Sequence, residues 1–63
     1  MTKSEKGMWL TNIENAADAV AAEYGSEVAK SVFRRYGARG TYDLSPCYYN
    51  KVFADLELIA NGN

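Results

Sequence analysis

The sequence predicts an all-α protein, a compact single domain made of three helices. Residues that favour helix starts and helix ends punctuate the chain, and between them apolar residues recur every three or four positions. Alanine, the strongest helix former, is concentrated where the first helix is expected. We therefore expect helices at residues 11–24, 26–36 and 45–60. Residues 1–10 would then be an N-terminal tail, and residues 11–61 a single three-helix domain.

The first predicted helix begins at Thr11. Thr11 and Glu14 have the spacing of a capping box, in which the hydroxyl and the carboxylate each accept a hydrogen bond from a backbone N–H at the helix start. Five alanines follow between residues 16 and 22, so this helix carries few bulky side chains and should lie close to the other two. Gly25 suits the left-handed conformation that commonly ends a helix.

The second and third predicted helices carry most of the large apolar side chains and should form the heavier half of the domain. Ser26 can cap the second helix, Gly37 can end it, and residues 38–44 have the composition of a loop. Ser45 and Pro46 indicate the start of the third helix, because proline at the first helical position has no N–H to lose. The apolar face of the third helix contains Tyr49, Val52, Phe53, Leu56, Ile59 and Ala60.

Length and composition exclude several classes of protein. A chain of 63 residues forms one domain with a small core, whose stability should be marginal unless helix packing is efficient or the protein forms a homo-oligomer. The chain has one cysteine and no histidine, which excludes an internal disulfide and a catalytic histidine and disfavours a zinc site. Cys47 is therefore best interpreted as a small buried apolar residue rather than a nucleophile. We expect no enzymatic activity, no metal and no cofactor.

The N-terminal segment and the overall hydropathy indicate a cytoplasmic protein. Residues 1–10 contain lysines but no apolar run of the length found in signal peptides. No stretch approaches the roughly 20 apolar residues of a membrane span. A single, reduced thiol is typical of the cytoplasm, and we expect no contact with a membrane.

Charge is distributed unevenly along the chain. Residues 26–42 have a net charge of +3, from four basic residues and one acidic residue. Residues 11–25 have a net charge of −3, from three acidic residues, and residues 43–63 have −2, from three acidic residues and one basic residue. Several tyrosines follow the arginines of the basic segment. Arginine and tyrosine are enriched where proteins contact partners.

We call the predicted binding residues the basic–aromatic surface: Lys30, Arg34, Arg35, Arg39, Tyr42, Tyr48 and Lys51. We expect these residues to bind another protein, with arginines pairing with carboxylates of the partner and tyrosines acting as anchors. The alternative is a nucleic-acid-binding module in which the same residues contact phosphates and stack on bases. The net charge of −1 argues against strong nonspecific binding to nucleic acid. A third interpretation is structural: the basic residues form a solvated helix end and pair with the acidic first helix.

Two further patterns have a structural and a functional interpretation. Trp9 and its apolar neighbours either fold back onto the helices or anchor a partner, and folding back is favoured because a small core needs apolar area. Val20, Ala21 and Gly25 resemble the first helix and turn of a helix-turn-helix motif. Ser26 stands where that family has an apolar residue, so an ordinary tight turn between two helices is favoured.

Residues 42–56, with the sequence YDLSPCYYNKVFADL, resemble small uncharacterised proteins carried on conjugative elements of gut bacteria. A further stretch of similarity lies at residues 33–40. The resemblance implies a bacterial, cytosolic protein encoded on a mobile element, and small proteins of that kind are often regulators or inhibitors of a host defence protein. No activity is attached to the group, so the resemblance transfers no catalytic or binding residue.

Overall fold

A computed structural model describes residues 1–62 and confirms the predicted all-α, three-helix domain. The helices are α1 (Lys3–Tyr24), α2 (Ser26–Arg34) and α3 (Tyr49–Ala60). Two short 3-10 turns, η1 (Thr41–Asp43) and η2 (Pro46–Tyr48), lie between α2 and α3. Residues 1–62 contain no β-strand, and none of their helices is both long and apolar enough to cross a membrane.

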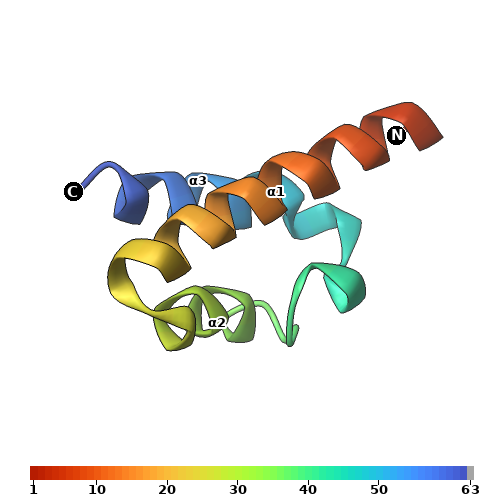
Figure 1. Cartoon of the computed structure of the whole chain (residues 1–63). Helices are drawn as coiled ribbons and strands as arrows, with labels where there is room; N and C mark the ends of the chain where they lie inside the picture. The colour runs from red at the N-terminus through yellow and green to blue at the C-terminus, as the bar shows by residue number, and fades with distance from the viewer. Residues whose placement is uncertain (63) are drawn as a thin grey trace.

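α1 is the longest helix and the element on which the others pack (Figure 1). The chain turns back after α1, so α2 runs antiparallel to it, whereas α3 runs in the same direction as α1. Both α2 and α3 contact α1 more extensively than they contact each other. As expected, α2 and α3 contribute most of the large buried side chains, namely Val32, Phe33, Tyr49, Val52 and Leu56. Although α1 carries few bulky side chains, it contributes the fully buried Ile13 and Val20, and both other helices pack against it.

The first helix begins eight residues before the predicted Thr11, at Lys3. The capping box is formed by Thr2 and Glu5: Glu5 N donates to Thr2 Oγ1 at 3.1 Å, and Thr2 N donates to Glu5 Oε1 at 3.1 Å. Residues 3–10, expected to be a tail, are thus the first turns of α1. The chain contains two Thr-x-x-Glu segments, and the earlier one sets the boundary, so that Trp9 lies within α1 and packs on Phe53 of α3.

Gly25 ends α1 as predicted, whereas α2 ends at Arg34, two residues before the predicted Tyr36. Gly25 has φ of 96° and donates its N–H to Ala21 O at 2.9 Å, which makes an ordinary tight turn between the helices. Gly37 has φ of 74°, and the bonds Ala38 N to Phe33 O and Gly37 N to Arg34 O, both 3.1 Å, form a Schellman motif. The expected side-chain cap at Ser26 is not formed, because Gly25 occupies the N-cap position.

The start of α3 differs from the prediction by one turn. Pro46 opens the 3-10 turn η2, in which Tyr48 N donates to Ser45 O at 3.0 Å, and the α-helix follows from Tyr49. This tight turn directs Cys47 outward and Tyr49 into the core. The interpretation of Cys47 as a buried residue is therefore wrong.

The core is small and draws on every helix and on the connection between α2 and α3. The buried apolar residues are Ile13, Ala16, Val20, Ala29, Val32, Phe33, Ala38, Leu44, Tyr49, Val52 and Leu56. Alanines of α1 and α2 are among them, in keeping with the expected close approach of the first helix. Within residues 1–62, no buried side-chain nitrogen or oxygen lacks a hydrogen-bond partner.

Candidate partner-binding surface

Every basic residue of the segment 26–42 is close to a carboxylate of the same chain. The distances are 3.8 Å for Lys30 Nζ to Glu27 Oε1, 3.5 Å for Arg34 Nη2 to Glu27 Oε2, 3.7 Å for Arg35 Nη1 to Asp55 Oδ2, and 3.6 Å for Arg39 Nε to Asp43 Oδ2. The structural interpretation made from the sequence expects the basic residues to pair with carboxylates of the first helix, and this expectation is wrong. The acidic residues used are in α2, η1 and α3, so the basic–aromatic surface divides into three groups.

The first group lies on α2 and comprises Lys30, Arg34 and Glu27, whose ion pairs are exposed. Lys30 and Arg34 share the carboxylate of Glu27, and the side chains of all three are more than half exposed. Exposed pairs of this kind contribute little to stability and are screened by salt. Lys30 and Arg34 are therefore part of a solvated helix face.

The second group, which we call the Asp55 cluster, comprises Arg35, Tyr36, Tyr48, Lys51 and Asp55. Tyr36 Oη donates a 2.6 Å hydrogen bond to Asp55 Oδ2, the same oxygen that faces Arg35. The rings of Tyr36 and Tyr48 are 5.1 Å apart at an interplanar angle of 40°, and Lys51 Nζ lies 5.8 Å from the centroid of Tyr48. These contacts connect the end of α2 to the start of α3.

The pKa of Tyr36 reflects its position in the Asp55 cluster. The hydrogen bond to Asp55 raises the pKa of Tyr36 above its ordinary value of 10.0, with smaller contributions from desolvation and from the charge of Asp55. The sequence did not identify Tyr36 or Asp55 as members of a polar cluster. No local spacing could have done so, because the two residues are 19 positions apart.

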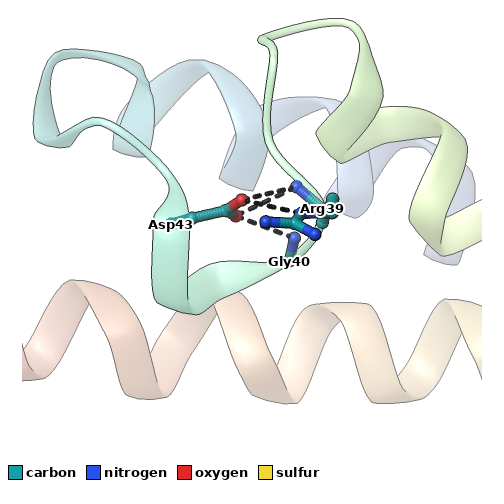
Figure 2. A network of polar contacts seen from close by, with 3 residues as sticks. All are labelled: Arg39, Gly40 and Asp43. Atoms are coloured by element: carbon teal, nitrogen blue, oxygen red, sulfur yellow. Dashed lines mark hydrogen bonds and ion pairs between the residues drawn. The ribbon is translucent and has the colours of Figure 1, made fainter.

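The third group is the segment 39–43, which we call the Tyr42 loop. Figure 2 shows the carboxylate of Asp43 pointing at the backbone of Arg39 and Gly40. Asp43 Oδ1 accepts hydrogen bonds from Arg39 N at 2.9 Å and Gly40 N at 3.1 Å, and Asp43 Oδ2 lies 3.2 Å from Arg39 N. A single side chain therefore fixes the backbone of this loop.

The protonation of Asp43 follows from those contacts. Desolvation raises the pKa of the carboxyl group, but the hydrogen bonds from Arg39 N and Gly40 N, with the nearby guanidinium of Arg39, outweigh it. The net result is a pKa of Asp43 below its ordinary value of 3.8. Asp43 is therefore ionised at neutral pH and accepts both backbone bonds.

Tyr42 is displayed on this fixed backbone. Its relative exposure is 79%, the highest among the large apolar and aromatic residues, while the side chain of Arg39 is 83% exposed. The ring of Tyr42 lies close to Gly40, where a Cβ atom would come within 3.3 Å of Tyr42 Cε1. Gly40 thus permits the ring to lie against the loop backbone.

A separate apolar groove lies between α1 and α3. It has a volume of about 310 Å³ and is lined by Glu5, Met8, Trp9, Asn12 and Phe53. The rings of Trp9 and Phe53 meet edge to face, with centroids 6.0 Å apart and an interplanar angle of 75°. Trp9 therefore packs against the domain, as expected, although it does so within α1. The sequence does not predict this groove, because residues 1–10 are expected to be a tail, although the spacing of Thr2 and Glu5 already fits a capping box.

The chain has no match among family models, curated proteins or solved structures. Within residues 1–62, no three or more acidic, cysteine or histidine side chains come together as a metal site would require. Cys47 Sγ lies 3.4 Å from Ser45 Oγ, on the exposed turn η2. Function is therefore inferred from the surface chemistry of the chain itself.

Proposed function

We propose that this protein is a small, non-enzymatic protein-interaction module and that the Tyr42 loop is the centre of its binding surface. The observation that carries the proposal is the 79% exposure of Tyr42 on a loop whose backbone is fixed by Asp43. Tyrosine and arginine are the residues that most often dominate binding energy at protein interfaces. Arg39 and Tyr42 present both side chains from one five-residue segment.

Pre-organisation strengthens this proposal. Binding normally costs free energy because loops and side chains lose conformational freedom. In the Tyr42 loop, the Asp43 carboxylate already orders the backbone, and the ring of Tyr42 already lies against Gly40. A partner with a pocket for a phenol ring would therefore meet a surface that needs little further ordering.

The electrostatics favour a protein partner over a nucleic acid. Binding to phosphates depends on cations that can replace the counterions of the backbone. Lys30, Arg34, Arg35 and Arg39 each have a carboxylate of this chain within 3.8 Å, so phosphates would compete with those groups. The nucleic-acid alternative is therefore the weaker one. A carboxylate of a protein partner can approach the exposed guanidinium of Arg39 while its Nε remains near Asp43.

The resemblance of residues 42–56 to mobile-element proteins supports a bacterial and cytoplasmic setting for the partner. In that setting the module would act as a regulator, or as an inhibitor of a host defence protein. The Tyr42 loop lies at the end of the molecule opposite the turn at Gly25 (Figure 1), together with the start of α3. The first part of the segment that carries the resemblance, residues 42–48, therefore lies at or beside the proposed binding surface.

The test compares proteins captured from a bacterial lysate by four forms of the full chain: wild type, Tyr42→Ala, Tyr42→Phe and Tyr24→Ala. We expect a partner that is retained by wild type, by Tyr42→Phe and by Tyr24→Ala, and lost with Tyr42→Ala. Tyr24 is the matched control because it is also an exposed tyrosine but lies at the end of α1.

Capture that is indifferent to Tyr42 would contradict the proposed surface. The nucleic-acid alternative is tested with labelled single- and double-stranded DNA and RNA in fluorescence anisotropy at low and physiological salt. Binding that weakens steeply with added salt would replace the proposal with the nucleic-acid alternative.

A further inference from the structure

The first turns of α1 extend beyond the rest of the molecule (Figure 1). Residues 1–8 are all exposed, although helix α1 begins at Lys3. A helical segment without tertiary packing is only marginally stable in water, because helices of this length gain most of their stability from a packed apolar face. The start of α1 is therefore helical although the rest of the chain does not cover its surface.

That unpartnered surface is the apolar groove described above. Trp9 and Phe53 form its aromatic part, and Met8 remains 65% exposed beside them. Exposed methionine next to half-buried aromatic rings is typical of a site that another protein covers.

The polar residues of the groove, Glu5 and Asn12, are complementary between two copies of the chain. Glu5 and Asn12 both line the groove, one on each side of Met8 and Trp9 along α1. In a two-fold symmetric dimer, residue i of one copy contacts residue j of the other, and residue j of the first contacts residue i of the second. If two α1 helices lie antiparallel about an axis between Met8 and Trp9, the level pairs on the groove face are Glu5 with Asn12 and Met8 with Trp9. The side-chain amide of Asn12 can then donate to the Glu5 carboxylate of the second copy, twice by symmetry.

The charge pattern of α1 favours the same antiparallel arrangement. Residues 1–10 carry two lysines and one glutamate besides the amino terminus, whereas residues 11–25 carry three acidic residues and no basic one. An antiparallel pair keeps the two lysine-bearing helix starts apart, and it also sets the two helix dipoles in opposite directions. A parallel pair would bring like charges together along the whole length of both helices.

From this self-complementarity we infer that the groove formed by Glu5, Met8, Trp9, Asn12 and Phe53 is the interface of a homodimer with antiparallel α1 helices. None of these residues belongs to the Tyr42 loop, so the inference does not depend on the proposed function. A dimer of this kind would carry two Tyr42 loops, and a partner with two binding sites would bind it with increased avidity.

The experiment measures self-association of the full chain by sedimentation equilibrium over a wide range of protein concentrations. We expect a reversible dimer whose dissociation constant rises at least ten-fold in Met8→Glu, because the substitution places a charge in the apolar centre of the interface. Leu58→Glu is the matched control, since Leu58 is 54% exposed on α3 and does not line the groove. It should leave the dissociation constant unchanged.

A second pair of variants tests the register. Asn12→Lys should strengthen the dimer, because a lysine would face Glu5 of the second copy, whereas Asn12→Glu should weaken it by placing two carboxylates level with each other. Circular dichroism verifies that each variant remains helical. A chain that stays monomeric up to about 1 mM, a dimer that Met8→Glu does not weaken, or equal effects of the two Asn12 variants would overturn the inference.

Discussion

The Asp55 cluster and the Tyr42 loop contain the same three kinds of side chain, an arginine, a tyrosine and an aspartate, and use them in opposite ways. In the Asp55 cluster the tyrosine hydroxyl donates to the aspartate at 2.6 Å, so the tyrosine connects two helices. In the Tyr42 loop the aspartate accepts hydrogen bonds from backbone N–H groups instead, and the tyrosine faces solvent. The difference shows that the partner of the carboxylate decides whether a tyrosine stabilises the fold or is available to another molecule.

The largest expected effect on stability is in the Asp55 cluster, for Tyr48→Ala. The half-buried ring of Tyr48 packs against Tyr36 and under Lys51, and losing it removes an aromatic pair and apolar area. We expect the free energy of unfolding to fall by about 1–3 kcal/mol, measured by urea unfolding. The control Tyr42→Ala removes an exposed ring and should change it by less than about 0.5 kcal/mol. Equal losses for both variants would remove the distinction between the two regions.

The next effect appears at alkaline pH and involves Tyr36. Because its pKa is raised in the folded state, Tyr36 stabilises the fold fully below the ordinary value of 10.0, and the contribution is lost as pH rises through the higher folded value. Wild type should therefore be more stable than Tyr36→Phe at pH 7, and the difference should shrink above about pH 10. Urea unfolding at both pH values measures this. A difference that stays constant with pH would show that the hydroxyl of Tyr36 is not bound to Asp55.

A smaller effect appears at acidic pH and involves Asp43. Its pKa is depressed in the folded state, so its contribution to stability is present above the ordinary value of 3.8 and is lost as pH falls through the lower folded value. The stability advantage of wild type over Asp43→Ala should therefore diminish below about pH 4. The two regions would then weaken at opposite ends of the pH scale. Asp18→Ala, a change to an exposed aspartate of α1, serves as the control in the same acid titration.

The smallest expected effect is that of Gly40→Ala. A Cβ at this position would lie 3.3 Å from Tyr42 Cε1, so the ring must shift while the backbone, which is extended at Gly40, keeps its conformation. Partner binding should weaken about three-fold, on the order of 0.6 kcal/mol, with little change in stability. Gly7→Ala has no atom within 4 Å of the new Cβ and should leave binding unchanged. If Gly40→Ala binds as wild type does, the position of the Tyr42 ring is not pre-organised by its contact with Gly40.

Features set by neighbouring residues were predictable from the sequence. Gly25 and Gly37 end their helices with positive φ, as the position of glycine after an apolar helical stretch indicates. The helical phase of α3 placed Tyr49, Val52 and Leu56 on its buried face. Each of these depends on contacts within a few residues or on a regular repeat.

Features that depend on distant contacts were not predictable. The chain contains two Thr-x-x-Glu segments, and the packing of Trp9 on Phe53 of α3 accompanies helix formation from the earlier one. The carboxylate partners of the basic residues were also misassigned. Asp55 faces Arg35 and Tyr36 only because α2 ends where α3 passes, and charge counted along the sequence cannot show that.

The way Asp43 holds its loop has a consequence for protein engineering. The carboxylate binds main-chain N–H groups at positions 39 and 40, and every residue except proline at position 39 keeps its N–H. The side chains at positions 39 and 42 can therefore be exchanged while Gly40 and Asp43 are kept. The segment is suited to a randomised library, in which new binding specificities are selected on an unchanged 63-residue scaffold.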